Sequence, residues 1–141
     1  LEALGAMPHD AVLVIGEAAL LLAARRQYPH VVDLGAEWKE WTGLPFVVAV
    51  WAARRAADPE GVRAIHARLL ESRAWGLGHL DQLAQDAARA TGVAPAVCRA
   101  YLGTLDYALG PRHLEGLTTF FRRLAGDGLV PDRSLSFITA A

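Results

Sequence analysis

The chain has 141 residues, 53% of them hydrophobic, which is typical of a single domain with a sizeable core. The formal net charge is −1 with acids and bases interspersed, which excludes the basic face of a nucleic-acid-binding protein, and no apolar stretch reaches the roughly 18 residues that a membrane span requires. The lone Cys98 excludes an internal disulfide, and the composition predicts a cytoplasmic domain with neither nucleic-acid nor membrane partners.

The first part of the chain is predicted to be α/β. Residues 1–7 look like the tail of a helix without a cap or an initiator Met, so we expect the chain to be part of a longer protein. Residues 11–15 (A-V-L-V-I) predict a buried strand. Gly16 then turns the chain into a helix expected over residues 17–27.

The next segment has the most distinctive pattern of the chain. A short strand at residues 31–32 precedes one or two helical turns that carry Trp38 and Trp41, and Thr42 with the glycine after it ends the helix. The eight apolar residues 46–53 are rich in Val and aromatics, which predicts a central strand buried on both faces.

After residue 53 the sequence changes to a series of helices. Asp58-Pro59-Glu60 is a strong helix start, because Asp is a good N-cap, Pro fits the first turn and Glu lies near the positive end of the helix dipole. Further helices are predicted from about residue 80 to Gly92, from Pro95 to about Ala108 and from Gly110 to the turn at residues 126–128, with a short strand at residues 134–138.

The turn at Gly16 is a candidate anion site. In open α/β sheets ligands bind beyond the carboxyl ends of the strands, a glycine there lets a ligand approach the backbone, and free N–H groups at a helix start favour anions. The backbone N–H groups of Glu17 and Ala18 are the predicted contacts, since the Glu17 carboxylate would repel an anion. The alternative, that Gly16 only makes a tight turn and Glu17 only complements the helix dipole, stays open.

Trp41 and Thr42 are the second group of candidate ligand contacts. Trp38 and Trp41 lie three residues apart and share a helical face, a spacing that favours a core role over a ligand wall, and Thr42 is expected to end the helix. No catalytic residue and no metal site are assigned, because the histidines are scattered without metal spacing and without a triad pattern. Cys98 lies mid-helix, where it is predicted to act as a small hydrophobe.

Two stretches of the chain resemble a known enzyme family. Residues 10–20 (D-A-V-L-V-I-G-E-A-A-L) and 28–52 (Y-P-H-V-V-D-L-G-A-E-W-K-E-W-T-G-L-P-F-V-V-A-V-W-A) resemble the menaquinone-biosynthesis enzymes of the futalosine route, in the chorismate dehydratase branch. A sister branch, which makes dihydroxynaphthoate from a cyclised futalosine, resembles the same stretches but carries a catalytic histidine where this chain has Gly16. That difference favours the dehydratase. The dehydratases commonly carry Asp where this chain has Glu17, an acid-for-acid change.

The resemblance implies a fold, an activity and a site. The fold would be α/β and type II periplasmic-binding-protein-like, with the ligand in the cleft between two lobes. Residues 1–45 would end the second lobe, and residues 46–141 would supply the return strand and C-terminal helices of the first. The activity would be that of a carbon–oxygen lyase that eliminates water from the dicarboxylate chorismate, giving 3-[(1-carboxyvinyl)oxy]benzoate without a metal or organic cofactor. The partner would be the N-terminal half of the same protein, which would hold the catalytic base and acid. The candidate substrate-binding residues are Gly16, Glu17, Ala18, Trp41 and Thr42.

Other functions stay open from the residues alone. The same fold serves solute receptors and the effector domains of transcription regulators, so a binding module without catalysis is one alternative. The sister naphthoate-forming enzyme is another. A non-catalytic helical interaction domain is a third, although the apolar strands and the Trp-Thr-Gly-Leu-Pro turn speak against it.

Overall fold

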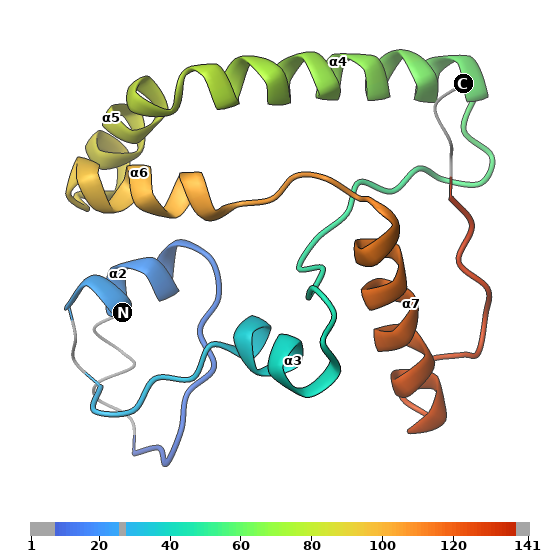
Figure 1. Ribbon diagram of the computed structural model, residues 1–141, viewed down its shortest axis with the longest axis horizontal. Helices are drawn as coiled ribbons and strands as arrows, with labels where there is room; N and C mark the ends of the chain where they lie inside the picture. Colours follow the sequence, from blue (N-terminus) through green and yellow to red (C-terminus); the bar gives the residue numbers. More distant parts are fainter. Residues whose placement is uncertain (1–7, 26–27, 138–141) are drawn as a thin grey trace. The chain divides into compact units, whose positions relative to one another are not determined.

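The computed structural model describes residues 8–25 and 28–137, and within these ranges all regular secondary structure is helical (Figure 1). The helices are α2 (Glu17–Arg25), α3 (Leu34–Thr42), α4 (Pro59–Gly78), α5 (Leu80–Thr91), α6 (Pro95–Thr104) and α7 (Pro111–Gly126). The chain divides into two compact units: the first combines residues up to 31 with residues 75–105, and the second combines residues 32–74 with residues from 106 onward. None of the described helices is both long enough and apolar enough to cross a membrane.

The predicted α/β fold of the type II periplasmic-binding-protein class is wrong, because the described residues form neither a strand nor a sheet. Residues 11–15 and 46–53 are non-helical, as expected, but within the described ranges no backbone hydrogen bond joins either run to a neighbouring segment. A strand is stable only when its N–H and C=O groups are paired. The apolar pattern predicts extended backbone without specifying a partner for it.

Burial of these runs also differs from the expectation. Val48 is 82% exposed and Trp51 is 85% exposed, although both were predicted to lie in a central buried strand. Residues 31–32 and 134–137 likewise form no strand, and residue 138 lies outside the described residues, as does the predicted helix tail at residues 1–7. The assignment of residues 1–45 and 46–141 to two lobes stays a prediction.

The helices begin and end largely where their capping residues predict. Asp33 Oδ1 accepts hydrogen bonds from the N–H groups of the second and third residues of α3, at 2.9 and 3.1 Å. Asp58 Oδ2 accepts from Gly61 N–H at 2.7 Å, which confirms the helix start predicted there. Gly43 and Gly92 adopt left-handed φ values of 71° and 73° and end α3 and α5, as expected.

One helix end differs from the prediction, and another cannot be compared because it lies outside the described residues. α6 stops at Thr104, whereas the apolar pattern extended it to Ala108, because Leu105 has β-region dihedral angles and the chain is extended beyond it. α2 is described to Arg25, and the end expected at residue 27 lies outside the described residues.

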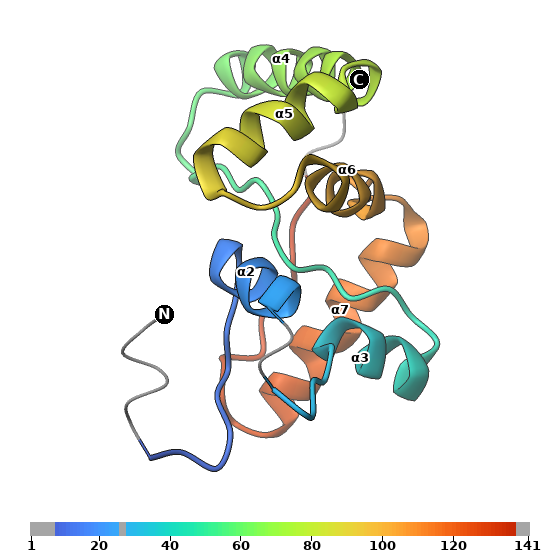
Figure 2. The same ribbon diagram turned by 90° about the vertical axis from the view of Figure 1, so that its left-hand side faces the viewer.

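The core of the first unit lies between α5 and α6, which contact each other with their axes crossing (Figures 1 and 2). Ala84, Val93 and Cys98 are buried there, and Leu21 of α2 packs against them. Cys98 is 1% exposed and its thiol lies 3.8 Å from the Val93 carbonyl oxygen, so the small hydrophobic role predicted for it is confirmed.

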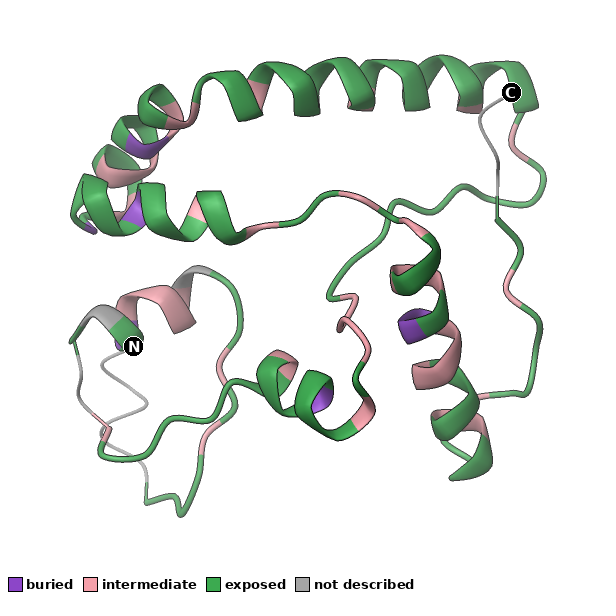
Figure 3. Cartoon of the chain, viewed as in Figure 1, coloured by how far each residue is buried: buried purple, intermediate pink, exposed green. Residues whose placement is uncertain are grey.

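The core of the second unit is an aromatic cluster. Trp38 of α3 lies 5.5 Å from Phe120 of α7 and 6.0 Å from Phe46, measured between ring centroids, and Phe46 and Phe120 meet edge to face at 5.4 Å. Figure 3 shows a buried position on α3, where Trp38 lies, and one on α7, where Gly116 and Leu117 lie, whereas Phe46 and Phe120 are partly buried. The cluster holds the end of α3, the turn after it and α7 together.

Gly116 permits the close approach of α7 to that turn. A Cβ atom at position 116 would overlap the carbonyl oxygen of Pro45 and would lie 3.7 Å from the Cβ of Leu44. Only glycine therefore allows α7 to lie against residues 44–45 at this distance.

Candidate functional site

Gly16 adopts a left-handed backbone conformation directly before α2. Its φ is 66°, and the N–H groups of Ala19 and Leu20 donate to its carbonyl oxygen at 3.1 and 3.3 Å. The N–H groups of Glu17 and Ala18 precede the first intrahelical bonds, and no described residue accepts from them. This geometry is compatible with both interpretations of the turn, as an anion contact and as a tight turn alone.

The two tryptophans of α3 differ in environment although they touch. Trp38 is buried in the aromatic cluster, whereas Trp41 is 67% exposed and meets Trp38 edge to face at 5.8 Å. The core role predicted for the pair therefore applies to Trp38 alone. The indole N–H of Trp38 is buried and has no hydrogen-bond partner in the described part of the chain.

Thr42 completes the end of α3 through its hydroxyl group. The hydroxyl donates to the Trp38 carbonyl oxygen at 2.7 Å and accepts from the Leu44 N–H at 3.2 Å. Its single proton is therefore used within the turn, which supports the predicted helix-ending role. A ligand at Thr42 would have to donate to the remaining lone pair of the oxygen.

Two arginines of α7 contact the last turn of α3. The Arg123 guanidinium lies over the Trp41 ring, 4.0 Å from its centroid, and Arg112 donates to the Gly43 carbonyl oxygen at 2.6 Å. A cation at this carbonyl is favourable because the C-terminal end of a helix carries partial negative charge. Arg123 thus adds a positive charge to the exposed aromatic surface of Trp41, a combination suited to an anion with an unsaturated or ring body.

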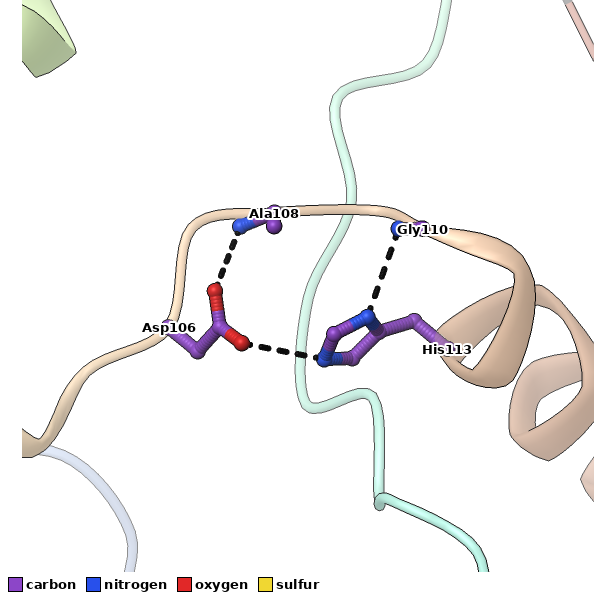
Figure 4. A network of polar contacts seen from close by, with 4 residues as sticks. All are labelled: Asp106, Ala108, Gly110 and His113. Atoms are coloured by element: carbon purple, nitrogen blue, oxygen red, sulfur yellow. Dashed lines mark hydrogen bonds and ion pairs between the residues drawn. The ribbon is translucent and has the colours of Figure 1, made fainter.

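Asp106 and His113 form a polar network at the start of α7 (Figure 4). His113 Nδ1 accepts from the Gly110 N–H at 3.3 Å, and Nε2 lies 3.2 Å from Asp106 Oδ2. Because Nδ1 is an acceptor, the ring proton of the neutral form lies on Nε2, the nitrogen that faces the carboxylate. The other carboxylate oxygen accepts from the Ala108 N–H at 2.8 Å. Both ring nitrogens are engaged, so the network stabilises the helix start and leaves no ring nitrogen for proton transfer.

The candidate residues fall into the two separate units. Gly16, Glu17 and Ala18 belong to the first, and Trp41 and Thr42 to the second.

Sequence reasoning missed Arg112 and Arg123, which reach α3 from about 70 to 80 residues away along the chain. It also missed the Asp106–His113 network, for which a signal exists: a polar side chain three residues after a helix N-cap commonly reaches back to the N-cap N–H. No group of three or more His, Cys, Asp and Glu side chains suited to a metal ion occurs within residues 8–25 and 28–137.

Comparison with known proteins identifies the family. Residues 1–126 match a protein family described as menaquinone biosynthesis. The chain belongs to this family. It is 37% identical over 131 residues to the chorismate dehydratase of Thermus thermophilus, an alignment that covers 82% of this chain and 48% of that protein. It is 39% identical over 72 residues to the 1,4-dihydroxy-6-naphtoate synthase of the same organism, which covers 47% of this chain and 26% of that protein. The chain thus spans about half the length of the dehydratase.

Proposed function

We propose that the whole protein is a chorismate dehydratase, a cytoplasmic carbon–oxygen lyase that converts chorismate to 3-[(1-carboxyvinyl)oxy]benzoate in menaquinone biosynthesis. The longer of the two similarities supports this proposal, because the dehydratase matches most of the chain and the naphthoate synthase about half of it.

The backbone conformation of Gly16 is the observation that favours one of the two activities over the other. Its φ of 66° lies in the left-handed region that glycine adopts without strain and that side chains with a Cβ seldom adopt. The sister branch, as the sequence resemblance implies, needs a catalytic histidine at this position. A glycine with this backbone favours the dehydratase.

The proposed reaction makes modest demands on the protein. A base removes a proton from one ring carbon, the electron pair of that C–H bond forms the new ring double bond, and hydroxide leaves and is protonated to water. The product ring is aromatic, so the elimination is strongly downhill. Orientation of the dicarboxylate and electrostatic stabilisation of the departing hydroxide can then supply most of the acceleration.

The residues of this chain are proposed to hold the substrate. In the first unit the N–H groups of Glu17 and Ala18, after Gly16, are suited to a carboxylate. In the second unit, Trp41 offers an aromatic face beside the Arg123 guanidinium. Thr42 can only accept from a substrate hydroxyl, because its proton is used by the Trp38 carbonyl.

The base and the acid are not assigned to residues of this chain. The chain aligns with 48% of the Thermus thermophilus dehydratase. We propose that the base and the acid lie in the segment of the whole protein that corresponds to the rest of that dehydratase, and that this segment is the partner of the 141-residue chain. The 141-residue chain alone is accordingly expected to be inactive on chorismate.

Variants of the full protein test the substrate contact in the second unit. Trp41→Ala and Arg123→Gln should each raise the KM for chorismate by about two- to fivefold, as expected for loss of an exposed cation–π or charge contact. Trp51→Ala and Arg63→Gln are matched controls, because both residues are also exposed, and should leave KM unchanged. Equal effects of the two pairs would remove Trp41 and Arg123 from the substrate site. Turnover of cyclised futalosine in place of chorismate would assign the protein to the sister activity instead.

A further inference from the structure

A groove runs between α7 and the C-terminal tail of the second unit. It has a volume of about 160 Å³, which is room for a ligand several times the size of a water molecule, and α7 lines one side of it with Thr118, Phe121 and Arg122. The tail lines the other side with Asp132, Arg133 and Ser134. None of the catalytic or substrate-binding candidates named above belongs to it.

The groove holds two arginines that form no ion pair with a described carboxylate. The ion pairs among the described residues do not include Arg122 or Arg133, and both side chains are exposed. Among the described residues that line the groove, Asp132 is the one with an acidic side chain, so these residues carry a net charge of about +1 from two guanidinium groups and one carboxylate. The Ser134 hydroxyl makes no hydrogen bond with another described residue, and it can donate to a ligand.

The rest of the lining is apolar. The Phe121 ring is partly exposed and forms one wall, and Ala125, Pro131 and Leu135 complete the lining. The Thr118 hydroxyl donates to the Leu114 carbonyl oxygen at 2.6 Å, so it adds no free donor to the groove. An inorganic anion would leave the apolar wall unused, whereas a neutral apolar molecule would leave the guanidinium groups unused.

We propose that this groove binds a small carboxylate with an apolar or aromatic body. Arg122 and Arg133 would hold the carboxylate, with Ser134 donating a further hydrogen bond, and the body of the ligand would lie against Phe121. Guanidinium groups match the planar geometry of a carboxylate, and the wall supplies the apolar contact. The inference is independent of the proposed dehydratase activity, because it rests on a different set of residues.

Titration of the full protein with benzoate, followed by NMR chemical shifts at low ionic strength, tests the proposal. Arg122→Gln and Arg133→Gln should each weaken benzoate binding by about two- to fivefold, the range of exposed charge pairs. Asp132→Asn should strengthen it by a similar factor, since a like charge is removed. Arg63→Gln on α4 is the control for a general loss of positive charge and should have no effect. Trp51→Ala, which removes an exposed ring that belongs neither to this groove nor to the proposed chorismate contact, should also have no effect.

Two ligands complete the test. Benzyl alcohol, which keeps the ring without the charge, should bind at least fivefold more weakly than benzoate, and so should inorganic phosphate, which keeps the charge without the ring. Benzoate binding that is insensitive to both arginine variants would overturn the proposal. If benzyl alcohol bound as tightly as benzoate, the role of the guanidinium groups would be overturned. If phosphate bound as tightly as benzoate, the role of the apolar wall would be overturned.

Discussion

Replacement of Gly116 by alanine tests the contact that joins α7 to the turn after α3. In an unobstructed helix interior, Gly→Ala stabilises by roughly 0.8–1 kcal/mol through helix propensity. At position 116 the added Cβ would overlap the Pro45 carbonyl oxygen and would lie 3.4 Å from the Pro45 carbonyl carbon. These are backbone atoms next to a proline ring, so they cannot move aside as a flexible side chain could. Overpacking of this kind costs about 1–3 kcal/mol.

The displacement would also reach the aromatic cluster. Moving α7 away from the turn separates Phe120 from Trp38 and Phe46, and each such aromatic contact contributes about 0.5–1.5 kcal/mol. After subtraction of the propensity gain, we expect Gly116→Ala to lower the free energy of unfolding by about 2 kcal/mol. Urea unfolding, followed by tryptophan fluorescence, measures this change in the free energy of unfolding.

Gly103→Ala provides the matched control for this measurement. Gly103 lies in α6 with nothing within 4 Å of an added Cβ, so the same substitution should be neutral or stabilising there. If Gly116→Ala proved as stable as wild type while Gly103→Ala behaved as expected, α7 would not approach residues 44–45 in the way described.

Further outcomes are expected for three single-residue variants and for the isolated chain. His113→Ala should lower the free energy of unfolding by about 1 kcal/mol, because the Gly110 N–H loses its hydrogen-bond acceptor. His66→Ala is the control, since His66 is exposed and its loss should leave stability unchanged. Equal thermal unfolding of the two variants would contradict the capping role of His113. Gly16→Ala should cost about 1–2 kcal/mol because its φ is left-handed, and unchanged denaturant stability would show that this φ is wrong. The isolated 141-residue chain should associate in analytical ultracentrifugation, since many large apolar side chains are exposed. Val48→Asp should reduce that association and change the free energy of unfolding by less than about 0.5 kcal/mol, because Val48 is exposed. A wild-type chain that stays monomeric would contradict this expectation.

The sequence predicted the helices well because their ends are specified locally. Asp58 and the glycines at positions 43 and 92 act on backbone groups within a few residues, so their effect can be recognised without knowledge of the fold. Cys98 was also predicted correctly as a small core residue, although its burial depends on tertiary contacts, with Ala84 of α5 and Leu21 of α2 among its core neighbours.

The strands were predicted wrongly because strand formation depends on a partner that the run itself does not encode. Residues 46–53 have the composition of a buried strand, yet Val48 and Trp51 are exposed in a segment that forms no backbone hydrogen bond with another described segment. The contacts of α7 with α3 were missed for a related reason: Arg123 reaches Trp41 across 82 positions, and no local spacing rule relates them. Trp41 and Thr42 were found as candidates, whereas the guanidinium groups beside them required the three-dimensional structure.

The most direct test of the proposed function is incubation of the full protein with chorismate, without added cofactor and in the presence of EDTA, followed by mass spectrometry of the products. We expect an aromatic product that is lighter than chorismate by one water molecule, formed at the same rate with and without the chelator. Unchanged chorismate together with turnover of cyclised futalosine would contradict it, and so would chorismate that binds tightly but is recovered intact.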